Sequence, residues 1–183
     1  MKRILALFLA AVLICSMTAC QDQREPDPIS APGSNGASKP TSKEPPVLTI
    51  QDGSGSEINA NLGTHSWTYA NDDGTMSGIC ADSSHPLEWK EFLVPLATDY
   101  ETVTLHFDVP PQELTIRCWS DDHWGQVNAK AKTASLDGWD LELKKGGYIY
   151  EVIATWTGEN LAAEGTAYYG FYVIHDNQSH TVD

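Results

Sequence analysis

The sequence predicts an all-β fold, an antiparallel sandwich of two sheets with one short helix. Three observations lead to this prediction. From Val47 onward, apolar residues recur at every second position, which is the period of a half-buried strand. Turn-forming sequences separate these alternating segments at short intervals, as they do in antiparallel sandwiches. The last two segments, 148–156 and 166–175, are long and substantially apolar on both faces.

The first half of the expected domain contains short strands joined by turns. Residues 47–50 form the first strand, and the glycine-rich stretch 51–56 is a turn between strands. The next strands are marked by alternating apolar residues, which are Ile58, Ala60, Leu62, Trp67 and Tyr69. The tetrapeptide 71–74 has the composition of a hairpin turn and leads into a strand near 75–80.

One segment, 84–92, has the features of a short helix. Ser84 is a suitable N-cap, and Pro86 falls in the first turn, where proline is tolerated. The residues of its apolar face are Leu87, Trp89 and Phe92. Pro95 follows closely and limits the length of the helix.

Strands return in the second half of the domain. Apolar and polar residues alternate over 102–107, and the proline-containing stretch 108–113 turns the chain. The strand that follows is expected to direct Leu114, Ile116 and Cys118 inward, with Arg117 and Trp119 outward. We then expect a turn at 137–138, a strand at 139–143 and a turn at 144–147. The last two strands follow, with a loop at 158–160 between them.

The run Gly146-Gly147-Tyr148-Ile149-Tyr150, at the start of a long strand, resembles the corner before the penultimate strand of immunoglobulin-like domains. The resemblance implies an antiparallel immunoglobulin-like β-sandwich, in which the hydroxyl of Tyr148 or Tyr150 bonds to upstream backbone. The chain departs from antibody domains, since no cysteine follows two residues later and no Cys-Trp-Cys spacing is present.

A second resemblance covers most of residues 47–175 and depends on three motifs. These motifs are Gly63-Thr64-His65-Ser66-Trp67, Arg117-Cys118-Trp119-Ser120-Asp121 and Gly147-Tyr148-Ile149-Tyr150-Glu151-Val152. They resemble a domain of clostridial-type lipoproteins, which also follows the membrane part of some penicillin-sensing antirepressor-type metallopeptidases. Those peptidases use a His-Glu-x-x-His helix, which is absent here, so no proteolytic activity is implied.

Residues 1–19 have the pattern of a secretory signal peptide. Lys2 and Arg3 precede an apolar stretch, 4–14, that is too short to span a bilayer as a mature helix. Met17-Thr18-Ala19-Cys20 resembles the lipobox of bacterial lipoproteins, with methionine where leucine is commonest. The resemblance implies a diacylglyceryl group on Cys20, cleavage just before it, and a membrane-anchored chain facing the extracytoplasmic side. The alternative is ordinary secretion with cleavage near Ala19.

The domain boundaries follow from composition. Residues 20–46 are expected to be the lipidated cysteine and a Pro/Ser-rich linker, because this stretch contains six of the ten prolines and few residues that could form a core. Residues 47–183 are then the folded domain.

The chain is strongly acidic, with a formal net charge of −14, and loss of Lys2 and Arg3 with the signal makes it more so. Such a surface repels phosphate backbones and anionic headgroups, so nucleic acid is not expected as a partner. The membrane is expected to be reached through the lipid on Cys20. Solubility explains the acidity. The alternative is that the acidic surface binds calcium or a cationic wall component.

Cys80 and Cys118 are the two cysteines outside the expected signal and anchor. Outside the cytoplasm they can form a disulfide. The alternative is two buried free thiols, and both remain open because sequence gives no distance between them.

The candidate ligand-binding residues are Trp119, Asp121, Asp122, His123 and Trp124. Indole faces stack on the C–H groups of sugars, while carboxylates accept hydrogen bonds from hydroxyls. The alternative is a strand end and a polar loop, with a tryptophan covering the edge of the sandwich. No metal site is expected, because the acidic pairs at 72–73 and 121–122 match no EF-hand loop and the histidines are scattered. No cofactor is expected, since no phosphate-binding loop is present.

The sequence contains no Gly-x-Ser-x-Gly motif. A carboxylate pair such as Asp121 with Glu151 could form in space, but among 25 acidic residues some pair always will, so it is no evidence of hydrolysis. We therefore expect a non-enzymatic binding or sensing module for an envelope glycan or protein. The alternatives are a carboxylate-dependent envelope hydrolase and a structural or protease-inhibitor-like module.

Overall fold

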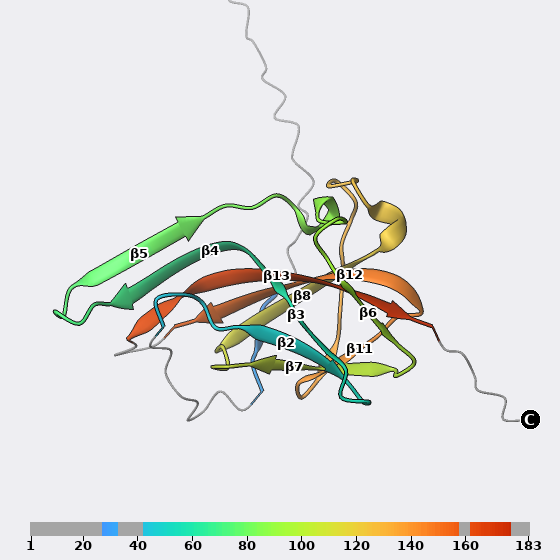
Figure 1. Ribbon diagram of the computed structural model, residues 1–183, viewed down its shortest axis with the longest axis horizontal. Helices are drawn as coiled ribbons and strands as arrows, with labels where there is room; N and C mark the ends of the chain where they lie inside the picture. Colours follow the sequence, from blue (N-terminus) through green and yellow to red (C-terminus); the bar gives the residue numbers. More distant parts are fainter. Residues whose placement is uncertain (1–26, 33–41, 158–161, 177–183) are drawn as a thin grey trace, which may run out of the picture.

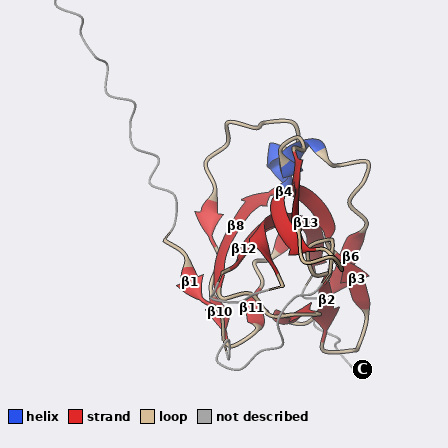
Figure 2. Cartoon of the chain, turned by 90° about the vertical axis from the view of Figure 1, so that its left-hand side faces the viewer, coloured by secondary structure: helices blue, strands red, loops and turns tan. Residues whose placement is uncertain are grey.

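The computed structural model describes residues 27–32, 42–157 and 162–176. Over these residues the chain is all-β and forms two sheets that pack against each other (Figure 1; Figure 2). The two-sheet sandwich predicted from the alternating pattern is confirmed. One strand pair, β6 with β13, is parallel, and the other pairs among the described strands are antiparallel.

The larger sheet has eight strands. Its main order is β1 (Ile29–Ser30), β8 (Glu113–Ser120), β12 (Gly146–Trp156), β13 (Ala163–His175), β4 (Asn61–Ala70) and β5 (Met76–Ala81). Two short strands join it at the sides: β6 (Pro95–Thr98) pairs with β13, and β9 (Lys132–Thr133) pairs with β8. The two long strands with apolar residues on both faces, β12 and β13, lie in the middle of this sheet.

The smaller sheet has five strands. Their order is β10 (Leu136–Asp137), β11 (Asp140–Glu142), β7 (Thr102–Phe107), β2 (Leu48–Asp52) and β3 (Glu57–Asn59). Its inner face supplies aliphatic side chains to the core, whereas the larger sheet supplies most of the aromatic ones. The strands expected near 47–50, 102–107 and 139–143 all belong to this sheet.

Aromatic side chains fill the space between the sheets. Trp67 and Trp156 meet edge to face with their ring centroids 5.4 Å apart, and Tyr150 stacks on Phe171 at 5.1 Å. All four are almost completely buried. Both indole N–H groups donate to backbone carbonyls, so the core contains large rings without leaving these donors unpaired.

The helix predicted over 84–92 is wrong. Only the 3₁₀ turn η1 (Pro86–Glu88) forms, and its N-cap is the ring of His85 rather than Ser84. A nine-residue helix between two prolines is marginal on its own, and tertiary contacts favour another conformation here. Leu87 is buried as expected, but Phe92 is 71% exposed. None of the helical turns among the described residues is long and apolar enough to cross a membrane.

Parts of the stretch predicted to be a linker pack against the domain. Ala31 is buried, and its N–H donates to the carbonyl of Gln112 next to β8. The hydroxyl of Tyr169 donates to the carbonyl of Pro46 at 2.6 Å inside the core. Residues 27–32 and 42–46 are therefore part of the fold, and the expected signal peptide, Cys20 and residues 33–41 lie outside the described residues.

Candidate functional site

The outer face of the larger sheet, which points away from the smaller sheet, is covered at one end and open at the other. Two neighbouring rows of side chains run along it. On β8 the row is Glu113, Thr115, Arg117 and Trp119, and opposite it on β12 the row is Thr155, Ile153, Glu151 and Ile149. The segments 82–94 and 121–131 cover the Trp119 end and form a second apolar cluster there.

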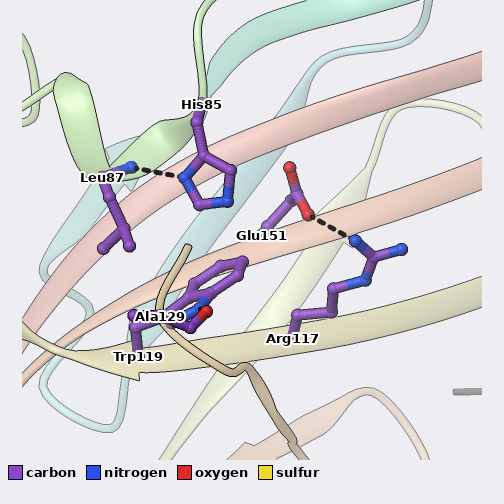
Figure 3. Close-up of polar contacts among 6 residues, drawn as sticks. All are labelled: His85, Leu87, Arg117, Trp119, Ala129 and Glu151. Carbon is purple, nitrogen blue, oxygen red and sulfur yellow. Dashed lines mark hydrogen bonds and ion pairs between the residues drawn. The ribbon is translucent and has the colours of Figure 1, made fainter. Parts of the chain in front are cut away.

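Trp119 lies beneath this cover. Its side chain points to the outer face, as expected, but only 3% of the residue is exposed. Its indole N–H donates to the carbonyl of Ala129 at 3.0 Å, and the ring of His85 meets it edge to face at 4.9 Å (Figure 3). Trp119 therefore presents no free face to a sugar ring.

His85 joins the cover to the sheet. Its Nδ1 accepts the N–H of Leu87 at 3.1 Å and so begins the turn η1 (Figure 3). Burial lowers the pKa of this histidine, while the nearby carboxylate of Glu88 acts in the opposite direction. With Nδ1 as the acceptor, the neutral ring carries its proton on Nε2.

Arg117 and Glu151 form an ion pair next to the covered end. The guanidinium Nη1 lies 3.6 Å from the carboxylate Oε2, and Glu151 is only 7% exposed (Figure 3). Burial raises the pKa of Glu151, and the charge of Arg117 opposes that increase. Nothing in the local sequence distinguishes this glutamate from the other acidic residues, and only its place in β12 makes it buried.

The acidic loop that follows Trp119 is bound to its own sheet. Residues 121–123 form the 3₁₀ turn η2 (Asp121–His123). The carboxylate of Asp121 accepts the hydroxyl of Tyr172 at 2.8 Å, and burial together with this contact raises the pKa of Tyr172 to about 12. The carboxylate of Asp122 accepts the hydroxyl of Ser120 at 3.0 Å. Trp124 is half-buried against the edge of the Tyr172 ring.

Of the five predicted ligand-binding residues, Trp119, Asp121, Asp122 and Trp124 each contact other side chains or backbone of the domain. His123 is half-buried in the η2 turn. Asp121 and Glu151, the example of a carboxylate pair considered above, have separate partners: Asp121 bonds to Tyr172 and Glu151 lies beside Arg117.

A groove of about 330 Å³ lies at the open end of the same outer face. Its lining residues are Asp27, Pro28, Glu113, Leu114, Thr115, Ile153 and Thr155. It combines two exposed carboxylates, two hydroxyls and aliphatic surface. Sequence analysis did not find it, because two of its residues lie in the stretch assigned to the linker. Strand β1 brings them to β8 through the pairing of Ile29 with Leu114.

Cys80 and Cys118 do not form the disulfide considered above. Both thiols are free, with Cys80 exposed on β5 and Cys118 buried on β8. Strands β12, β13 and β4 lie between them, so they are roughly 19 Å apart across the sheet, far beyond the reach of a disulfide. Burial raises the pKa of the Cys118 thiol.

Within residues 27–32, 42–157 and 162–176, no three His, Cys, Asp or Glu side chains come together in a way that could hold a metal ion. No protein-family model, curated protein or solved structure matches this chain.

Proposed function

We propose that this protein is a lipid-anchored extracytoplasmic lipoprotein whose immunoglobulin-like domain binds an envelope glycan or protein segment without chemical change. The lipobox-like sequence ending in Cys20 supports the location and the anchor. The groove beside β1 and β8 is the observation that supports binding. It is a concave surface with a few polar groups that converge on an aliphatic floor, which is the usual composition of a ligand site.

The chemistry of the groove favours a ligand rich in hydroxyl or ammonium groups. Asp27 and Glu113 are acceptors only when ionised, and the hydroxyls of Thr115 and Thr155 can donate or accept. Ile153 and Pro28 offer apolar surface to sugar C–H groups or to aliphatic side chains. The Arg117–Glu151 pair adjoins Thr115 and Ile153 along the two strands, next to the groove.

The immunoglobulin-like assignment is supported by the two packed sheets and by the place of Tyr150 near the start of β12, the strand before the last. The tyrosine-corner hydrogen bond that the resemblance implies is not formed by Tyr150, because its buried hydroxyl has no hydrogen-bond partner among the described residues. Burial raises the pKa of Tyr150.

A carboxylate-dependent hydrolase is the second candidate, because two carboxylates line one groove. A general acid needs an apolar surrounding that keeps its proton near neutral pH. Asp27 and Glu113 are both exposed to solvent. Glu151 is buried, but it lies beside Arg117 and does not line the groove. The geometry therefore favours binding over catalysis.

Calorimetric titration of the protein tests the proposal. The probes are peptidoglycan glycan strands freed of their stem peptides and, separately, the isolated stem peptides. Binding of either probe is expected, and the probe that binds identifies the ligand class. The double substitution Asp27→Asn with Glu113→Gln should weaken it at least about tenfold, since each lost charge-assisted hydrogen bond contributes about 1.5 kcal/mol or more.

The matched control is Asp137→Asn with Glu142→Gln, which removes the same charge from exposed residues of the smaller sheet. This control should bind like the wild type. Absence of binding by both probes, or equal weakening in the two double variants, would rule out the groove as the site. Release of reducing ends from the glycan strands would show that the protein is a hydrolase.

A further inference from the structure

Strand β5 is an open edge of the larger sheet. It pairs with β4 through Met76 to Ala81, and no other described strand pairs with it. The β4–β5 hairpin extends beyond the body of the sandwich, so its free side faces outward (Figure 1). Every second residue of such a strand directs its backbone N–H and C=O away from the sheet, toward a strand that could be added.

This edge lacks the features that usually prevent strand addition. Proteins protect an edge with lysine, proline, a β-bulge or a very short strand. The six residues of β5 include no charged residue and no proline, and their register with β4 is continuous. Met76 is 56% exposed, and Ile79 and Cys80 are also exposed. The edge can therefore accept an extended segment over its whole length.

The charges at the two ends of β5 indicate what kind of segment fits. Asp72 and Asp73 precede the strand, Asp82 follows it, and all three are exposed. Hydrogen bonds from Thr75 lower the pKa of Asp73, so its charge is retained in mildly acid solution. An uncharged edge with carboxylates at both ends is complementary to an extended segment with basic residues at both ends.

A second copy of this chain fits the edge less well. In an antiparallel pair of two β5 strands, Asp82 of each copy would lie close to Asp72 and Asp73 of the other. Like charges at both ends of the pair would then repel, and the chain as a whole carries −14. Lys43 lies over the ring of Tyr69 on β4, with its ammonium nitrogen 6.0 Å from the ring centroid.

We propose that the free edge of β5 binds an extended basic segment of a partner protein by strand addition. Backbone hydrogen bonds supply the affinity, and the carboxylates of Asp72, Asp73 and Asp82 select for basic ends. This surface lies at the opposite edge of the sheet from the groove near β1, and it does not depend on the function proposed for that groove.

Backbone hydrogen exchange in β5 tests the proposal, measured by NMR on the full-length chain in detergent micelles. The probe is a peptide of about seven alternating threonine and valine residues with lysine at each end, long enough to cover the strand. At about ten times the dissociation constant, exchange of the edge amides should slow about tenfold, because only the free fraction exchanges. A matched peptide with glutamate at each end should give no protection.

Substitutions at the edge separate charge from backbone effects. Asp72→Asn with Asp82→Asn should reduce the protection by the lysine-ended peptide, whereas Glu91→Gln with Asp137→Asn, which removes equal charge elsewhere, should not. Met76→Lys should abolish the protection, because lysine protects a strand edge and repels the basic ends of the peptide. Met76→Glu should preserve it, because glutamate attracts those ends. Met76 is exposed, so either change leaves the fold intact.

Equal protection by the lysine-ended and glutamate-ended peptides would overturn the assignment of a basic partner. Protection that rises with protein concentration in the absence of peptide would show that a second copy covers the edge instead. No protection at millimolar peptide would overturn the proposal altogether. None of these outcomes bears on the groove, whose variants are measured separately.

Discussion

At the scale of single residues, the outer face places the buried carboxylate of Glu151 beside the half-buried guanidinium of Arg117. A buried ion pair contributes little net stability, because desolvation of both charges offsets their attraction. Loss of one partner is different, since the remaining charge is buried without compensation. Glu151 is 7% exposed and lies 3.6 Å from Arg117, so loss of Arg117 would leave a buried carboxylate without its counter-charge.

We predict that Arg117→Leu lowers the free energy of unfolding by about 3 kcal/mol, because it leaves the Glu151 carboxylate buried without its counter-charge. The double variant Arg117→Leu with Glu151→Leu should lie within about 1 kcal/mol of the wild type. Urea titrations of the two single variants and the double variant measure this cycle. Additive losses in the double variant would contradict the prediction.

The loss in Arg117→Leu should also depend on pH. Burial already raises the pKa of Glu151 above its unfolded value, and removal of Arg117 raises it further. A carboxyl whose pKa is higher in the folded state costs no stability below its unfolded pKa, because it is protonated in both states. The free energy of unfolding then falls as the pH rises through the folded pKa. Arg117→Leu should therefore be least destabilising near about pH 4 and most destabilising near about pH 8. Urea titrations at the two pH values check this, and a loss that does not change with pH would contradict it.

At the scale of elements, glycines on the outer face explain why 82–94 becomes a cover instead of a helix. The Trp89 ring lies directly over Gly63 of β4 and Gly170 of β13, where any Cβ would collide with it. Its indole N–H donates to the hydroxyl of Ser84 at 3.0 Å. The serine predicted to cap a helix thus accepts a hydrogen bond from the tryptophan that packs on the sheet.

We predict that Gly170→Ala destabilises the protein by about 1–3 kcal/mol, because the added methyl group displaces Trp89 from its packed position. Gly78→Ala is the matched control on the same sheet, since a Cβ there meets only ordinary van der Waals contacts. It should change stability by no more than about 0.5 kcal/mol. Chemical denaturation measures both variants, and equal effects would show that Trp89 is not what makes Gly170 necessary.

At the scale of the whole molecule, the position of β1 determines how far the domain extends from its proposed anchor. Ile29 already pairs with Leu114, so eight residues, 21–28, lie between it and Cys20. Fully extended, they span at most about 30 Å. The groove, which includes Asp27, lies at this same end of the chain. The proposed anchor therefore holds the groove close to the membrane surface, not far out in the envelope.

We predict that Cys20→Ala abolishes lipid attachment in a bacterium that processes lipoproteins. Incorporation of labelled palmitate and partition into the detergent phase of Triton X-114 measure the change. Cys15→Ala, in the same expected signal region, is the matched control and should keep both properties. Retention of label and detergent partition by Cys20→Ala would show that the lipobox-like sequence does not direct acylation.

Much of the fold could be predicted from sequence because strand patterning is local. The alternation at 102–107, the hairpin turn at 71–74 and the long apolar strands β12 and β13 all appear where the pattern predicted them. Strands β1 and β6 were missed, because two and four residues carry too little periodic signal. Each forms only because a partner strand distant in the sequence provides its hydrogen bonds.

The sequence by itself determined the strand pattern, the acidic surface and the lipobox-like motif at Cys20, since each depends on neighbouring residues or on composition. Only the tertiary structure decided that Trp119 is buried, that Glu151 lies beside Arg117, and that Cys80 and Cys118 are far apart. These outcomes depend on the order of strands in the sheet. Strand order is set by pairings between distant segments, and no local pattern encodes it.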